Sequence, residues 1–216
     1  MLEPIQGEGG VIIPDTGYLK KVRELCDKYN VLLITDEVQT GLGRTGKLMA
    51  YQWEGVKPDI VTLGKAISGG VTPVSGIVAN NFIMDTIKPG DHGSTYGGNP
   101  LGMAVARTAV EVIVEEGMVE NSLKMGALLE NKLRAINSPC VIDVRAKGLF
   151  CGMEFNHDLK YDGNHFAKIL MKNGLITKAT HRHVIRFAPA LVIEESEINE
   201  AVEIIEKSLQ EFDALN

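Results

Sequence analysis

Hydrophobic side chains recur at two spacings in the first half of the chain, and these spacings predict alternating helices and strands. Apolar residues at positions 18, 19, 22, 25, 26 and 29 share one face of a predicted helix over 18–29. A continuous apolar run at 31–34 follows it directly, as in a strand of a parallel sheet that is buried on both faces. Two further strands of this kind are predicted over 59–63 and 75–79. The alternation predicts an α/β fold.

The second half of the chain has a different pattern of elements. A helix over 101–116, preceded by Pro100 at the first helical position, carries mostly Ala, Val and Met and is expected to be largely buried. The elements predicted after it are a helix over 119–136, strands over 141–144 and 149–155, a helix over 164–173, strands over 175–178 and 184–187, and a helix over 196–212. The last helix has an apolar stripe formed by Ile198, Val202, Ile205, Leu209 and Phe212. We therefore predict a boundary near residue 118, which divides the chain into domains 1–118 and 119–216.

The composition is that of an ordinary globular protein, with 44% hydrophobic and 23% charged residues and a formal net charge of −6 over 216 residues. The acidic balance argues against nucleic acid or an anionic membrane as a partner. No apolar run approaches the ~18 residues that a membrane span requires. The three cysteines form no C-x-x-C pair, so we expect free thiols in a reducing compartment.

The first residues show no signal-peptide pattern and enter a predicted strand without any lead-in. We therefore expect the chain to be the C-terminal part of a longer protein. A cytoplasmic location is expected, or the mitochondrial matrix if the source is an animal and the N-terminus is missing.

Charged and polar residues follow two of the predicted strands at their carboxyl ends. Asp36 ends the first strand, Gln39 lies three residues further on, and Lys65 follows Gly64 at the end of the second. Taken alone, Asp36 would more often cap the following turn, and Lys65 would be an ordinary surface lysine. Ligands of open α/β sheets bind outside the carboxyl ends of the strands, so these side chains are candidates for one site.

One ligand satisfies both a lysine and an acid at this edge. Pyridoxal phosphate (PLP) carries an aldehyde that a lysine takes as an imine and a pyridine nitrogen that a carboxylate keeps protonated. Charge-free neighbours of Lys65 are expected to desolvate its amine and make it more nucleophilic. Ser94 and Thr95, in a Gly-rich segment before the helix at Pro100, offer donors for the phosphate.

Two other patterns suggest different ligands. Residues 41–47 match both G-x-G-x-x-G and G-x-x-x-x-G-K, which makes a P-loop-like NTPase a remote alternative. Leu48 replaces the hydroxyl residue that would hold Mg²⁺, and residues 36–40 separate the strand from the glycines. His181 and His183 form an H-x-H pair without a third ligand pattern, so no metal site is expected.

Four blocks of sequence, in the same order along the chain, resemble the class III (ω-amino group) aminotransferases. They are Glu-Pro-Ile-Gln-Gly-Glu-Gly-Gly at 3–10, Asp-Glu-Val-Gln-Thr-Gly-Leu-Gly-Arg-Thr-Gly at 36–46, Leu-Gly-Lys-Ala at 63–66, and His-Gly-Ser-Thr-Tyr-Gly-Gly-Asn-Pro-Leu at 92–101. The resemblance covers essentially the whole chain, and it corresponds to the C-terminal half of the longer chains of this family. It implies an α/β fold, namely part of a PLP fold-type-I large domain with a mainly parallel sheet and flanking helices, followed by a small α+β domain.

The resemblance also implies roles for individual residues at a cofactor site. Lys65 would form the imine with PLP and carry the transferred proton, and Asp36 would hold the pyridinium nitrogen. Gln39 would contact the ring 3-oxygen, Val38 would pack on the ring face, and Ser94 with Thr95 would bind the phosphate. In this family the phosphate ligands come from the neighbouring subunit, so a homodimer is expected.

Segments 173–178 and 181–191 resemble the ornithine branch of the family. This implies transfer of the δ-amino group of ornithine to 2-oxoglutarate, which gives glutamate semialdehyde (pyrroline-5-carboxylate) and glutamate. Glu8 and Arg186 would form an ion pair that opens when Arg186 takes the carboxylate of a 2-oxo acid. Two alternatives remain: an N-acetylornithine or other ω-amino acid aminotransferase, and a fragment that binds PLP without full activity.

Overall fold

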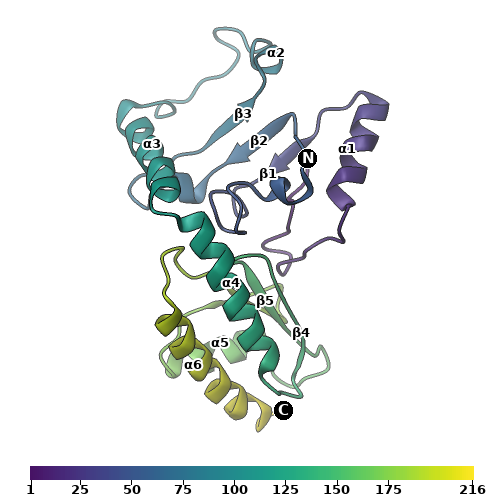
Figure 1. Cartoon of the computed structure of the whole chain (residues 1–216), viewed down its shortest axis with the longest axis vertical. Coiled ribbons are helices and arrows are strands. Elements are labelled where there is room, and N and C mark those ends of the chain that lie inside the picture. The colour runs from purple at the N-terminus through teal and green to yellow at the C-terminus, as the bar shows by residue number, and fades with distance from the viewer. The chain divides into compact units, whose positions relative to one another are not determined.

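The computed structural model describes residues 1–216 and separates them into two units (Figure 1). Unit 1 contains Met1–Pro4, Pro14–Gly43 and Lys47–Met118, and unit 2 contains Ile5–Ile13, Arg44–Gly46 and Val119–Asn216. Unit 2 therefore includes two short segments that the sequence assigned to the first domain. The domain division at residue 118 stays a prediction.

Unit 1 is built around a three-stranded sheet in the order β1 (Ile34–Asp36), β2 (Ile60–Leu63), β3 (Gly76–Ala79). β1 pairs parallel with β2, and β3 pairs antiparallel with β2. The helical segments of this unit are α1 (Tyr18–Tyr29), η1 (Ala50–Glu54), η2 (Lys65–Ser68), α2 (Asn81–Met84) and α3 (Pro100–Glu115). α1 has the predicted bounds, because its apolar residues follow the helical period and Asn30 ends it in a left-handed conformation.

Three expectations for unit 1 are wrong. The first strand begins at Ile34, and Val31 and Leu32 are exposed, because the chain leaves α1 through a hydrogen bond from Val31 N to Cys26 O before it reaches the sheet. β3 is an exposed, antiparallel edge strand instead of a third buried parallel one. α3 is not largely buried, since it packs on η2 along one side only.

Unit 2 contains an antiparallel sheet in the order β4 (Val141–Ala146), β5 (Cys151–Phe155), β7 (Val184–Phe187), β6 (Lys178–Thr180). Its helices are α4 (Met118–Ala135), α5 (Gly163–Lys172) and α6 (Glu195–Asp213). The predicted strand over 175–178 is displaced, because Gly174 (φ 105°) ends α5 in a turn closed by a hydrogen bond from Leu175 N to Leu170 O. Lys178 is thus the first residue of β6 and not the last.

The core of unit 2 is aromatic. Phe155, Phe166 and Phe212 are fully buried, with ring centroids 5.0–5.2 Å apart in edge-to-face or tilted pairs. Phe212 comes from the predicted apolar stripe of α6, of which Ile198, Ile205 and Leu209 are also buried. The periodicity in the sequence was therefore sufficient to identify the core-facing side of this helix.

Two glycines allow the segment Arg44–Gly46 to join unit 2. A Cβ atom at Gly126 of α4 would overlap the backbone of Gly148, and a Cβ at Gly148 (φ 56°) would overlap the backbone of Thr45. Ser122 Oγ also donates to Arg44 O at 2.9 Å and accepts from Leu149 N at 3.2 Å. Close backbone approach and one bridging hydroxyl hold the three segments together.

Candidate active site

The parallel pairing of β1 and β2 brings the ends of both strands to one edge of the sheet. Asp36 is paired in register with Thr62, and Lys65 lies three residues after Thr62. Gly64 lies directly against Val38, since a Cβ at position 64 would be 3.3 Å from Val38 Cγ1. The structure therefore places Asp36, Val38 and Lys65 around the same strand ends.

The Asp36 carboxylate is half-buried and has one oxygen in use. Its Oδ1 accepts the backbone N–H of Val38 at 3.0 Å, while Oδ2 accepts no hydrogen bond within the chain. The Asp36 N–H is itself tied to Leu2 O at 2.8 Å. A fixed backbone and one unused carboxylate oxygen suit this residue to hold a cationic group.

Lys65 opens η2 in a left-handed backbone conformation, with φ 46°. Few residues other than glycine adopt this conformation, and such strained positions cluster at functional sites. The side chain is exposed and Nζ has no hydrogen-bond or ion-pair partner, so the desolvated setting expected from the sequence is absent in this chain. The amine is accessible to a ligand.

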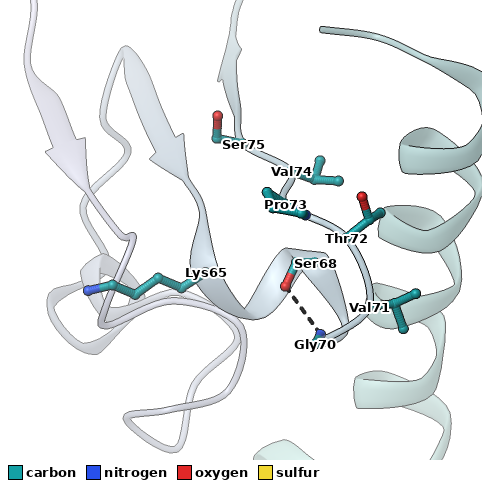
Figure 2. Close-up of a pocket in the computed structure, with 8 residues that line it drawn as sticks. All are labelled: Lys65, Ser68, Gly70, Val71, Thr72, Pro73, Val74 and Ser75. Atoms are coloured by element: carbon teal, nitrogen blue, oxygen red, sulfur yellow. Dashed lines mark hydrogen bonds between the residues drawn. The ribbon is translucent and has the colours of Figure 1, made fainter. Parts of the chain in front are cut away.

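A cavity of about 490 Å³ lies beside Lys65. Its other lining residues are Ser68, Gly70, Val71, Thr72, Pro73, Val74 and Ser75. Figure 2 shows the Lys65 side chain extending away from the segment 71–75 that forms most of this lining. Lys65 is the only predicted cofactor residue that lines the cavity.

Ser94 and Thr95 lie in an exposed turn before α3. Ser94 Oγ accepts the N–H of Gly97 at 3.0 Å, and Asn99 caps α3 by accepting from Gly102 N at 2.8 Å. Neither Ser94 nor Thr95 makes a hydrogen bond to Asp36 or Lys65. The structure of this chain thus does not assemble the predicted phosphate ligands with the predicted catalytic lysine.

Glu37 is a buried acid that the sequence interpretation did not use. Its Oε2 accepts from Thr40 Oγ1 (2.5 Å) and Ala50 N (3.1 Å), and its Oε1 accepts from Tyr51 N (3.0 Å). Burial raises the pKa of the Glu37 carboxyl, against the effect of these three donors. Glu37 ties the loop after β1 to η1 immediately beside Asp36.

The predicted ion pair between Glu8 and Arg186 is present within unit 2. Arg186 Nη1 donates to Glu8 Oε1 at 2.8 Å, and this bond lowers the pKa of the Glu8 carboxyl. Glu8 Oε2 also lies 3.5 Å from Lys178 Nζ. The acid therefore lies between two cations, of which the sequence interpretation named only one.

Arg44 is a second residue that the sequence interpretation missed. Its Nη1 donates to Leu149 O at 2.8 Å and Pro189 O at 2.7 Å. Burial, with a smaller contribution from the nearby charge of Arg186, lowers the pKa of Arg44 to about 10. Arg44 anchors the chain two residues past the end of β7 and adds positive charge near Arg186.

The glycine-rich segment 41–47 lacks the architecture of a P-loop. The residues after it form the short η1 and not a long helix, and Lys47 Nζ lies 5.4 Å from the ring centroid of Trp53.

His183, one of the two histidines of the H-x-H pair, stacks on His157 with ring centroids 4.5 Å apart. No group of three or more His, Cys, Asp or Glu residues could hold a metal ion.

Comparison with known proteins identifies the family. The family model for aminotransferase class-III matches residues 1–209. The chain belongs to the class-III aminotransferase family. Its family membership makes the NTPase alternative wrong.

Among curated class-III relatives, the mitochondrial ornithine aminotransferase of Drosophila melanogaster is 56% identical over 97% of this chain and 48% of its own length. Among solved structures, an ornithine aminotransferase of Toxoplasma gondii superposes with a TM-score of 0.94 at 44% identity, over 98% of this chain and 51% of its own. The acetylornithine aminotransferase of Elizabethkingia anophelis superposes with a TM-score of 0.93 at 49% identity, over 98% of this chain and 54% of its own. The chain spans about half the length of the curated relatives it matches.

These likenesses confirm the predicted fold class, part of a fold-type-I large domain followed by a small α+β domain. The description of the Toxoplasma structure places PLP at the active site of that protein. No helix of this chain is long and apolar enough to span a bilayer.

Proposed function

We propose that this chain supplies the lysine, the ring-nitrogen acid and the substrate-selecting ion pair of a PLP-dependent ornithine aminotransferase. The enzyme would transfer the δ-amino group of ornithine to 2-oxoglutarate, giving glutamate semialdehyde and glutamate. The observation that carries the proposal is the meeting of Asp36 and Lys65 at one edge of the sheet through the β1–β2 pairing.

The residues at this edge fit PLP by their chemistry. Lys65 has an accessible amine without a partner, and Asp36 has an unused carboxylate oxygen on a fixed backbone. Val38 presents an apolar side chain beside Gly64, and Gln39 is proposed as the contact to the ring 3-oxygen. When bound, PLP supplies an electron sink for the carbon that carries the transferred amino group.

Four side chains of this chain would then have separate roles in the reaction. Lys65 would hold the cofactor covalently through Nζ, and the same nitrogen would take a proton from the substrate carbon and return it. Asp36 would hold the proton of the ring nitrogen through charge-assisted hydrogen bonding. Arg186 would bind a substrate carboxylate, and Glu8 would cover Arg186 when the substrate end carries an amine.

Reduction with borohydride tests the central assignment. We expect the purified protein, incubated with PLP and reduced, to carry the cofactor on a peptide that contains Lys65. A Lys65→Arg variant should lose the label, whereas Lys57→Arg, which changes an exposed lysine before β2, should keep it. A label on any other lysine would overturn the assignment.

A shared phosphate site accounts for the exposure of Ser94 and Thr95. We propose that these residues bind the cofactor phosphate of a second subunit in a homodimer. Co-expressed Lys65→Ala and Thr95→Ala subunits should then recover about a quarter of the activity, because half of the dimers are mixed and each has one intact site. No recovery in dimers shown to be mixed would contradict the shared site.

The acetylornithine branch is the second candidate, supported by the likeness to the Elizabethkingia enzyme. The two substrates differ in the group on the α-nitrogen, and none of the residue roles proposed for this chain involves that nitrogen. Product analysis with each substrate separates them. Pyrroline-5-carboxylate from free ornithine supports the proposal, and turnover of N-acetylornithine alone would contradict it.

A further inference from the structure

Lys178 and Arg186 are directly opposite one another in the antiparallel pair β6–β7. Residues opposed in this way project from the same face with Cβ atoms roughly 5 Å apart, and two like charges in that position repel. Glu8 lies between them, with Oε1 2.8 Å from Arg186 Nη1 and Oε2 3.5 Å from Lys178 Nζ. One carboxylate therefore neutralises two cations on adjacent strands.

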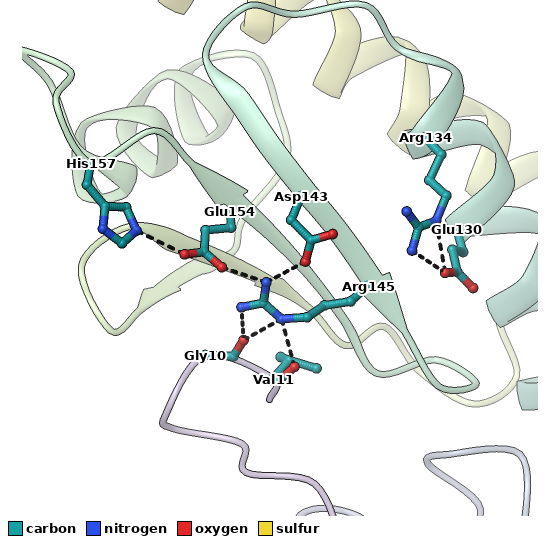
Figure 3. A network of polar contacts seen from close by, with 8 residues as sticks. All are labelled: Gly10, Val11, Glu130, Arg134, Asp143, Arg145, Glu154 and His157. Carbon is teal, nitrogen blue, oxygen red and sulfur yellow. Dashed lines mark hydrogen bonds and ion pairs between the residues drawn. The ribbon is translucent and has the colours of Figure 1, made fainter. Parts of the chain in front are cut away.

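The backbone that carries Glu8 is fixed by two independent anchors. Thr180 Oγ1, on the same strand as Lys178, donates to Glu8 O at 2.7 Å. Arg145 donates through Nη2 to Gly10 O at 2.6 Å and through Nε to Val11 O at 2.9 Å, as Figure 3 shows. A change of partner by Glu8 must therefore come from rotation of its side chain, which is 57% exposed.

The two cations differ in the exposure of their side chains and in the geometry of their charged groups. The Arg186 side chain is 17% exposed and that of Lys178 is 70% exposed. A guanidinium offers a planar fork to a carboxylate, whereas a lysine ammonium is a point charge on a flexible stem that can follow its partner. If a dicarboxylate occupied Arg186, Lys178 would therefore be the cation that remains beside Glu8.

We propose that Lys178 is a positioning residue that retains Glu8 when the carboxylate of a 2-oxo acid occupies Arg186. This inference rests on the proposed function. Without Lys178, the displaced Glu8 has no second cation, and its charge repels the incoming carboxylate. Lys178 therefore favours the dicarboxylate over the diamine at the same site.

Binding of glutarate, an unreactive dicarboxylate, tests the inference in the intact protein by calorimetry. We expect Lys178→Gln to raise the ratio of the glutarate Kd to the ornithine KM, measured from turnover, about threefold to fivefold, the scale of one exposed ion pair. Lys178→Arg should restore the ratio. Lys172→Gln is the matched control, because Lys172 is 74% exposed and lies 3.6 Å from Glu211, in a pair outside the site.

A direct readout separates this role from a structural one. Resonances of labelled lysine side chains should show the Lys178 ammonium shifting when glutarate binds, and Glu8→Gln should abolish that shift. An unchanged ratio in Lys178→Gln, with glutarate still bound by the wild type and lost in Arg186→Gln, would overturn the role of Lys178 alone. Absence of glutarate binding to the wild type would overturn the substrate assignment with it.

Discussion

At the scale of single residues, the carboxylate of Glu37 shows how a buried acid can support a site without facing it. Glu37 is 2% exposed and is the acceptor for one hydroxyl and two backbone N–H groups. A charge of this kind is costly to bury unless such donors meet it. Its neighbour Asp36 ends the strand, so the bonds of Glu37 also fix the backbone on which Asp36 stands.

We predict that Glu37→Gln destabilises the protein by about 1–3 kcal/mol near pH 5, because either Ala50 N–H or Tyr51 N–H then loses its acceptor. The deficit should shrink toward pH 8. The folded-state pKa of Glu37 is raised above the ordinary value of 4.5, so its contribution to stability is complete below that value and is lost as pH rises through the folded-state pKa.

Denaturant titrations of both proteins at several pH values measure this difference. Glu206→Gln, at an exposed position of α6, is the control and should change stability little at any pH. A deficit in Glu37→Gln that is constant with pH would contradict the raised pKa. A variant as stable as the wild type would contradict the importance of the three hydrogen bonds.

The sequence located charged residues at the sheet edge where a charge followed an apolar run, and the roles assigned to these residues stay predictions. Asp36 and Lys65 could be paired because strand ends of a parallel sheet meet at one edge. Glu37, Arg44 and Lys178 could not be assigned in this way. Their partners are backbone groups or side chains brought together only by the fold, such as Pro189 O for Arg44 at a separation of 145 residues.

At the scale of elements, periodicity gave α1 and β7 with their observed bounds, and the apolar stripe of α6 gave its buried face. The failures share a cause. A continuous apolar run shows that a segment is hydrophobic but not which neighbours cover it, so β3 and α3 were expected to be buried and are largely exposed. Strand direction was likewise hidden, because pairing is a property of two segments.

In helix α4, we expect a glycine-to-alanine substitution to change stability in the direction opposite to the one that helix propensity alone predicts. Alanine in place of an exposed helical glycine stabilises by about 1 kcal/mol. At Gly126 the added methyl group would overlap the backbone of Gly148, so we expect Gly126→Ala to destabilise unit 2 by roughly 1–3 kcal/mol or more.

Thermal unfolding with near-UV circular dichroism measures the effect. Gly76→Ala in β3 is the control, since a Cβ there meets nothing within 4 Å, and it should leave stability nearly unchanged. A Gly126→Ala variant that is as stable as the wild type would show that α4 can move away from Gly148 without loss of packing.

At the scale of the whole molecule, the two units are assembled from segments that interrupt one another. Residues 5–13 belong to unit 2, although Met1–Pro4 and Pro14–Gly43 on either side belong to unit 1. The contacts responsible join distant parts of the sequence, as in the bonds from Arg145 to Gly10 and Val11. Local pattern contains no information on such contacts, so the sequence could not predict that these segments belong to unit 2.

This division predicts which amides lose protection when one core is weakened. Phe212 is fully buried among aromatic rings, and Phe212→Ala should cost unit 2 about 3–5 kcal/mol. Hydrogen exchange should then accelerate in β5 and at the amide of Ile12, which is bonded to Gln6 O. The amide of Glu37, bonded to Thr62 O in unit 1, should exchange at its former rate.

Leu33→Ala provides the reciprocal control, because Leu33 is 2% exposed in the separate core that it forms with Leu19 and Val56. That variant should accelerate exchange at Glu37 and leave Ile12 protected. If instead the exchange rate of the Ile12 amide changes together with that of the Glu37 amide in both variants, residues 5–13 fold with unit 1. The segment that carries Glu8 then depends on the core of unit 1 for its protection. Equal acceleration everywhere would mean that the units unfold as one, because each then requires the other to remain folded.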